Sequence, residues 1–382
     1  MDPALLHDPA FPEAFESAAI LDEVRGDLGL LLWQTSRDVL LWGAAAPEQR
    51  DGLFVGGVEP EPLVGASETE ERLYAALREL RELLNAGCAG DEQRIVECCR
   101  MVARWAVNSG LERTAIAFAQ AGAIASPADA GQYVNAGRLL VRYRCRTAAE
   151  TWFRRGIALA RRASDWVSYA EAWLELGWLH ASRGETESAG RAFKSALRVS
   201  RRNGRLRHVR ARAHYGMMRV LAAAGDYTDA KLHGAKSLRW FGEHRERTGV
   251  THDLAALMME QEPVENAWEC SEMLQSVLPL RRSGADRIAT LTLLVRAAGY
   301  AGQDAIVADA WFNAVHVLER LDGSPDKARR LLDLARAGRA APGMDTGRVA
   351  AVARLAFDVA VRVDDRQMAL EAEAFRLELL RA

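Results

Sequence analysis

The stretch AWLELGWLHASRGETESAGRAFKSAL, residues 172–197, decides the fold of this chain. Its apolar and small residues recur at the three- and four-residue spacing of an α-helix, and the pattern breaks at Arg183 and Gly184. Gly184 suits the left-handed conformation that ends a helix. Gly177 falls inside the first helical segment, where a glycine costs roughly 1 kcal/mol. We therefore expect two antiparallel helices that approach closely, with Gly177 and Ala189 at their contact.

This helical hairpin resembles the tetratricopeptide repeat, whose positions are matched in order by Trp173, Leu176, Gly177 and His180 in the first helix and by Ala189, Phe193 and Ala196 in the second. His180 departs from the family, which usually has Tyr there. The same template fits residues 133–156, and with fewer matches residues 99–122 and 214–237. Beyond residue 250 the resemblance thins out.

The resemblance implies an all-α fold, a right-handed superhelix of stacked helix pairs. Helices are also expected over residues 14–45 and 68–86, where apolar residues follow the helical period. The predicted parts are an acidic N-terminal helical unit over residues 1–90 with an irregular linker near 46–67, tetratricopeptide-like repeats over 91–320, and C-terminal helices over 321–382 that cap the solenoid.

Charge is distributed unevenly along the chain, although the formal net charge is only −2. Residues 1–95 hold 19 Asp and Glu against seven Arg, whereas residues 138–212 hold 18 Lys and Arg against six Asp and Glu. Two interpretations of the acidic stretch at residues 59–71 stay open. It folds back over the basic centre and masks it, or it is a solvated linker.

No dinucleotide-binding, P-loop, hydrolase or zinc-protease motif occurs, and the eight histidines are dispersed. We therefore predict no enzymatic activity, no cofactor and no metal. The five cysteines form no C-x-x-C pair, which is typical of reduced thiols. Core packing is predicted for Cys98 and Cys99, with redox sensing as the alternative. The N-terminus has no signal-peptide pattern and no stretch is long enough to span a bilayer, so a cytoplasmic location is expected.

The family resemblance also implies a binding surface, because the first helices of the repeats line a concave groove. Residues next to the core positions of those helices should face it. The predicted partner-binding residues are Arg100, Arg104, Arg138, Arg142, Trp178, Arg212, Tyr215 and Arg219, and Leu174 is expected on the same surface. Guanidinium groups pair with carboxylates and stack on rings, which favours an acidic, partly apolar peptide or partner helix. Simple solvation of an arginine-rich surface is the alternative.

The sequence thus predicts a non-enzymatic interaction scaffold, adaptor or regulatory subunit, and its Arg- and Ala-rich composition indicates a bacterial source. The alternative is a ligand-sensing transcriptional regulator that binds a signal peptide with its repeats and DNA with an N-terminal unit. That alternative requires a basic N-terminal unit, and the acidity of residues 1–95 repels phosphates. No nucleic-acid or membrane partner is predicted. The segment at residues 368–382 either caps the stack or pairs with a second copy, so the oligomeric state stays open.

Overall fold

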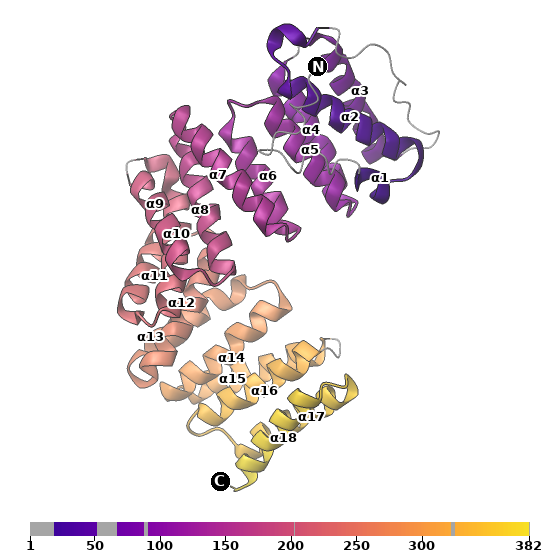
Figure 1. The fold of residues 1–382 in the computed structure, drawn as a ribbon. Coiled ribbons are helices and arrows are strands. Elements are labelled where there is room, and N and C mark those ends of the chain that lie inside the picture. Colours follow the sequence, from indigo (N-terminus) through magenta and orange to yellow (C-terminus); the bar gives the residue numbers. More distant parts are fainter. Residues whose placement is uncertain (1–18, 52–66, 88–90, 202, 322–324, 382) are drawn as a thin grey trace. The chain divides into compact units, whose positions relative to one another are not determined.

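The structure, a computed structural model, describes residues 19–51, 67–87, 91–201, 203–321 and 325–381. In this part of the chain every regular element is a helix. The chain divides into two compact units, residues 1–216 and residues 217–382, which we call the first and the second unit (Figure 1).

The helices of the first unit are α1 (Ile20–Glu23), α2 (Gly26–Ala44), α3 (Glu68–Asn85), α4 (Glu92–Asn108), α5 (Glu112–Ala125), α6 (Ala130–Arg142), α7 (Arg146–Arg162), α8 (Trp166–Ser182) and α9 (Thr186–Ser200). Helix α10 (Arg207–Ala223) spans the division between the units. The helices of the second unit are α11 (Tyr227–Phe241), α12 (Arg247–Gln261), α13 (Pro263–Val277), α14 (Gly284–Tyr300), α15 (Asp304–Glu319), α16 (Pro325–Ala340), α17 (Thr346–Arg362) and α18 (Arg366–Arg381). Short 3-10 turns lie at Pro47–Gln49, Gly204–Leu206 and Leu278–Leu280.

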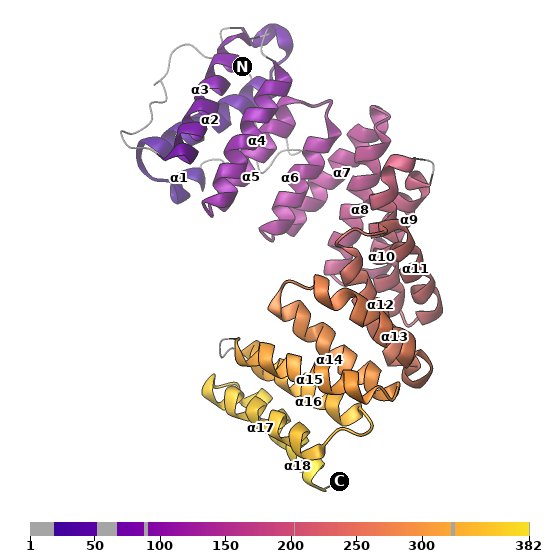
Figure 2. The ribbon, with the colours of Figure 1, turned by 180° about the vertical axis from the view of Figure 1, so that it is seen from behind.

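Consecutive helices pack as hairpins, which confirms the predicted all-α helical repeat. In the first unit α4 packs on α5, α6 on α7 and α8 on α9, and in the second unit α12 packs on α13, α14 on α15 and α16 on α17 (Figures 1 and 2). Gly110, Gly184 and Gly225 each lie between two consecutive helices and have φ angles of 74°, 77° and 81°. Glycine adopts this left-handed conformation at no steric cost, which is why the turns fall where the pattern breaks.

The expected close approach at Gly177 is confirmed, and the structure shows what fills the contact. A Cβ atom on Gly177 would lie 2.6 Å from the ring of Phe193 on α9, closer than real carbon contacts allow. Ala189 is fully buried on the same helix. Likewise, a Cβ atom on Gly137 of α6 would lie 2.4 Å from the ring of Phe153 on α7. In both of these hairpins the glycine inside the first helix therefore makes room for an aromatic ring of the second helix.

The predicted N-terminal helices are present as α1, α2 and α3, although residues 14–18 lie outside the described residues. Most of the predicted linker, residues 52–66, also lies outside them. The acidic stretch at residues 59–71 is described only from Ser67 onward, where it begins α3 with a capping box between Ser67 and Glu70. The rest of the proposed masking segment is not described. The predicted domain boundaries at residues 90 and 320 stay predictions.

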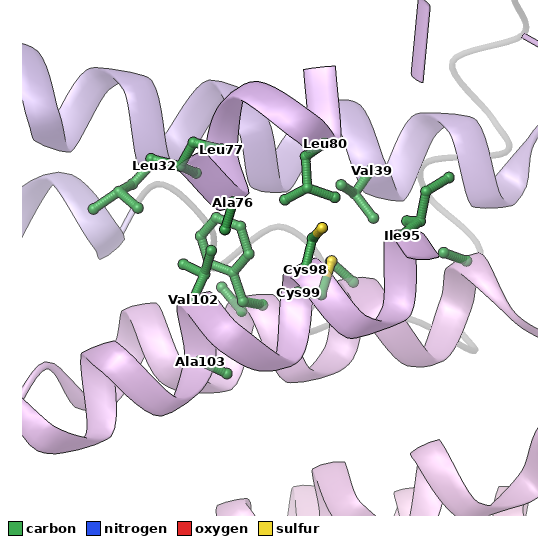
Figure 3. Close-up of a cluster of buried hydrophobic side chains, with 14 of the residues drawn as sticks. Leu32, Val39, Ala76, Leu77, Leu80, Ile95, Cys98, Cys99, Val102 and Ala103 are labelled. Carbon is green, nitrogen blue, oxygen red and sulfur yellow. The ribbon is translucent and has the colours of Figure 1, made fainter. Parts of the chain in front are cut away.

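Helices α1 to α5 share one hydrophobic core (Figure 3). Leu32 of α2, Leu77 and Leu80 of α3, and Cys98 and Cys99 of α4 all contribute to it. Burial raises the pKa of the Cys98 thiol to about 12, and it raises the pKa of Cys99 as well. These buried, protonated thiols support the core-packing interpretation of the pair. Among the described helices none combines the length and the apolar character that crossing a bilayer requires.

Candidate functional site

The predicted partner-binding residues lie on the first helices of successive hairpins, as expected. Their positions are Arg100 and Arg104 on α4, Arg138 and Arg142 on α6, Trp178 on α8, and Arg212, Tyr215 and Arg219 on α10. All except Arg219, which follows the division within α10, belong to the first unit. We call the surface made by α4, α6, α8 and residues 207–216 of α10 the first-helix face.

A groove of about 290 Å³ opens between α4, α5 and α6 at one end of the first-helix face. Its buried base includes Cys99 and Phe118, and Gln132 of α6 lies along it. Arg100 and Arg104 line the same groove, and both are exposed. Arg100 is paired with Glu97 at 2.6 Å. Arg104 forms no ion pair with any carboxylate that the structure describes, so its charge is available to a ligand.

The middle of the first-helix face is an ion-pair network rather than a row of free cations. Arg138 of α6 contacts Glu171 of α8 at 2.9 Å and Glu175 at 3.1 Å. Arg212 of α10 contacts the same Glu175 oxygen at 3.1 Å. Burial by itself would lower the pKa of Arg138, but Glu175 and Glu171 outweigh burial and the pKa is raised. The cationic groove expected from the sequence is therefore largely neutralised at Arg138 and Arg212 by the chain's own carboxylates.

Aromatic side chains form the other end of the first-helix face. The ring of Trp178 lies 5.2 Å from Phe193 in an edge-to-face contact and 5.4 Å from Tyr215. Phe193 also lies against Gly216, where a Cβ atom would come within 2.4 Å of the ring. The predicted Trp178 and Tyr215 thus come together as one cluster, half-buried and accessible. Leu174, in contrast, is fully buried and takes no part in the surface, which corrects its predicted exposure.

The remaining two predicted arginines, Arg142 and Arg219, are exposed. The guanidinium of Arg142 lies 5.9 Å from the centre of the Tyr143 ring, next to it in the chain. Arg219 is exposed in the second unit.

A second groove, which the sequence analysis missed, lies on the first helices of the second unit. It has a volume of about 550 Å³ and is formed by α12, α14 and α16. Arg296 donates to the carbonyl oxygen of Met259 at 2.9 Å, and Arg330 donates to the carbonyl oxygen of Ala285 at 2.9 Å. Arg296 directly follows Val295, a buried residue of α14, so the rule used for the upstream helices, applied to α14, would have found it.

The second groove also contains carboxylates. Arg336 lies 3.8 Å from Asp333 and 3.4 Å from Glu371. Burial raises the pKa of Asp333, against the opposing effect of Arg336 and its neighbours. Glu260 lines the groove as well. This surface therefore presents both signs of charge around an apolar base.

No protein-family model matches the sequence, and the search of curated proteins gives no match. Among solved structures, the apo form of the quorum sensor NprR from B. thuringiensis has 11% sequence identity and a TM-score of 0.52, covering 94% of this chain and 99% of that chain. The apo form of RapI has 12% identity and a TM-score of 0.49 over 74% of this chain and 98% of its own. PilF of Pseudomonas aeruginosa has 14% identity and a TM-score of 0.48, covering 60% of this chain and 95% of its own. The chain is a tetratricopeptide-like helical repeat protein, and similarity at these identities extends to the fold alone.

Proposed function

We propose that the chain is a non-enzymatic interaction scaffold that binds a peptide or partner helix along the first-helix face. The proposed partner-binding residues are Arg100, Arg104, Arg138, Arg142, Trp178, Arg212 and Tyr215, with Arg219 following on α10. Binding requires no catalytic step, because apolar burial and charge pairing supply the affinity.

The observation that carries this proposal is the groove beside Arg104. Its base is apolar, with Cys99 and Phe118 buried beneath it, and its rim carries a guanidinium without an ionic partner in the described structure. An apolar side chain of the partner fills such a groove, and an adjacent carboxylate pairs with Arg104. The Trp178 and Tyr215 rings provide the aromatic contact area that anchors binding partners.

The ion-pair network determines where on the first-helix face an acidic residue of the partner can bind. Arg138 and Arg212 already share Glu175, whose side chain is only 14% exposed. A partner carboxylate would have to compete with Glu175 for either guanidinium. We therefore place the acidic residue of the partner at Arg104, and neutral or basic residues opposite Glu171 and Glu175.

The test is selection of twelve-residue random peptides displayed on phage against the full chain, followed by titration of the enriched peptides. Enriched peptides should combine an Asp or Glu with neighbouring apolar residues. Arg104→Glu should weaken their binding by about tenfold or more, which corresponds to one charge-assisted pair. The matched control is Arg191→Glu on α9, because Arg191 is exposed and lies outside the first-helix face.

Three results would contradict the proposal. The enriched peptides could be uniformly basic, their binding could be indifferent to Arg104→Glu, or Arg191→Glu could weaken it equally. Salt-dependent retention of the chain on duplex DNA would instead favour the transcriptional regulator.

A further inference from the structure

A larger cavity of about 710 Å³ lies at helix ends of the first unit. It is formed by the last turns of α7 and α9, the first turn of α8 and Asn203. The residues that line it are Arg161, Trp166, Tyr169, Arg198, Val199 and Asn203. Its volume is within the usual range for small-molecule sites.

The indole of Trp166 is the largest apolar group at this cavity, and it is 49% exposed. It meets Tyr169 edge to face, with ring centres 5.8 Å apart. Trp152 of α7, in contrast, is buried in the core. In an edge-to-face contact the Tyr169 ring covers at most one face of the Trp166 indole, so a planar ligand group can stack on the other face.

The cavity is positively charged. Arg161 and Arg198 are exposed, and neither forms an ion pair with a carboxylate in the portion of the chain that the structure covers. Both lie in the last turn of a helix, where a cation also stabilises the helix end. Asp165 is the carboxylate next to Trp166 in the chain, and it accepts from the backbone N–H groups of Val167 and Ser168.

Asn203 supplies a directional polar group at the same cavity. Its side-chain carbonyl oxygen accepts from the backbone N–H of Arg205 at 3.0 Å. This bond uses the side-chain oxygen and leaves the amide nitrogen of Asn203, with its two N–H donors, for a ligand in the cavity that Asn203 lines. The cavity therefore offers a stacking surface, hydrogen-bond donors and two cations.

We propose that this cavity binds a nucleotide, with the base stacked on Trp166, an acceptor atom of the base edge bonded to the Asn203 amide, and the phosphate paired with Arg161 and Arg198. A simple anion would use the two arginines but not the indole. A peptide would be better accommodated by the first-helix face, which continues from helix to helix, whereas this cavity lies at helix ends. The site is independent of the proposed peptide binding.

The test is isothermal titration of the full chain with adenosine 5′-diphosphate, and with pyrophosphate and adenosine as the two half-ligands. The diphosphate should bind more tightly than either half-ligand. Trp166→Ala and the double variant Arg161→Ala/Arg198→Ala should each weaken its binding by about tenfold or more. Trp166→Phe keeps a stacking ring and should retain binding within about threefold.

Two matched controls keep the test specific. Arg191→Ala removes another exposed arginine from α9, and Trp268→Ala removes an exposed tryptophan from α13, where the side chain is 59% exposed. Both should bind the diphosphate as the unaltered chain does. The proposal is overturned if the diphosphate fails to bind, if Trp166→Ala has no effect, or if pyrophosphate binds as tightly as the nucleotide. Circular dichroism of each variant establishes that it is folded.

Discussion

Arginines at the middle of the first-helix face and two arginines of the second groove have different kinds of partner. In the first unit Arg138 and Arg212 are paired with carboxylates of α8, and one oxygen of Glu175 serves both. In the second unit Arg296 and Arg330 donate to backbone carbonyl oxygens. Neither of these two forms an ion pair with a described carboxylate.

The difference shows that the number of arginines on a surface does not give its available charge. A carboxylate neutralises the guanidinium, whereas a carbonyl oxygen satisfies one N–H group and leaves the net charge in place. The basic centre of the sequence, residues 138–212, is therefore less cationic on the first-helix face than its composition indicates.

The largest effect is expected from displacing α8, which carries the carboxylates of the first unit. In Gly177→Val the added side chain would overlap the ring of Phe193, since even a Cβ atom there lies 2.6 Å from it. We expect a loss of about 3 kcal/mol in the free energy of unfolding, the upper end for overpacked cores. Urea denaturation followed by circular dichroism measures it. Gly249→Val on α12 is the control, because a Cβ atom there meets nothing within 4 Å, and an equal loss in both variants would contradict the explanation.

A smaller effect is expected from Glu175→Gln, which removes the shared charge and leaves two partly buried guanidinium groups with weaker partners. The side chains of Arg138 and Arg212 are 37% and 27% exposed, so solvent compensates part of the loss. We expect the free energy of unfolding to fall by about 1–2 kcal/mol, below the range for fully buried pairs. Acidic peptides should bind the variant more tightly.

The control for this variant is Glu187→Gln, because Glu187 is 90% exposed and lies 3.5 Å from Arg191. Surface pairs of this kind contribute little. If Glu187→Gln and Glu175→Gln destabilise the chain equally, or if acidic peptides bind Glu175→Gln more weakly, the neutralising role of Glu175 is refuted.

In the second unit, Arg296→Met should cost about 1 kcal/mol, the usual net contribution of one hydrogen bond. The partner is an uncharged carbonyl, so this loss should change little between 0.1 and about 1 M salt, whereas the loss in Glu175→Gln should shrink. Denaturation at both salt concentrations tests the contrast. Arg282→Met, at an exposed position before α14, should be neutral. Equal salt dependence of the two losses would remove the distinction between arginines paired with carboxylates and arginines bonded to carbonyl oxygens.

The smallest effect on the structure is expected from thiol labelling of the native chain, because labelling replaces no arginine or carboxylate of the two grooves. Burial raises the pKa of Cys98 and of Cys270 to about 12, so both stay neutral thiols at pH 8 and react slowly. Cys145 is exposed and should be alkylated first. The experiment uses a Cys88→Ser background with mass-spectrometric peptide mapping. Rapid modification of Cys98 in the native chain would contradict the core-packing interpretation.

The same labelling in increasing urea compares the stability of the units. Cys98 and Cys99 report on the first unit, and Cys270 reports on the second. If the units unfold separately, the two sets become reactive at different urea concentrations. Simultaneous exposure would show one cooperative transition.

The hairpins were predictable from the sequence because their determinants are close together in the chain. Gly177 and Phe193 belong to one repeat, and Gly184 marks the turn between them. The pairing of Arg138 with Glu171 joins residues of two different repeats. It depends on the rotation of α8 relative to α6, which periodicity does not specify. The charge state of the face was therefore missed although its location was predicted.

The second groove and the helix-end cavity were missed for different reasons. The repeat template matches weakly beyond residue 250, so the rule that residues next to core positions face the groove was applied only to the upstream helices. Trp152 and Trp311 are buried packing residues, as large apolar side chains in helical repeats usually are. Trp166 differs because it is the first residue of its helix, where the side chain projects beyond the hairpin core.

The position of the Phe193 ring between Gly177 and Gly216 has an evolutionary consequence. The Phe193 ring contacts both α8 and α10, the helices that flank its own. The effect of a substitution at position 177, 193 or 216 therefore depends on the residues at the other two positions. A larger residue at either glycine demands a smaller one at position 193, and a smaller residue there leaves a void that both glycines are too small to fill. Divergent copies of this hairpin should therefore change all three positions together or none.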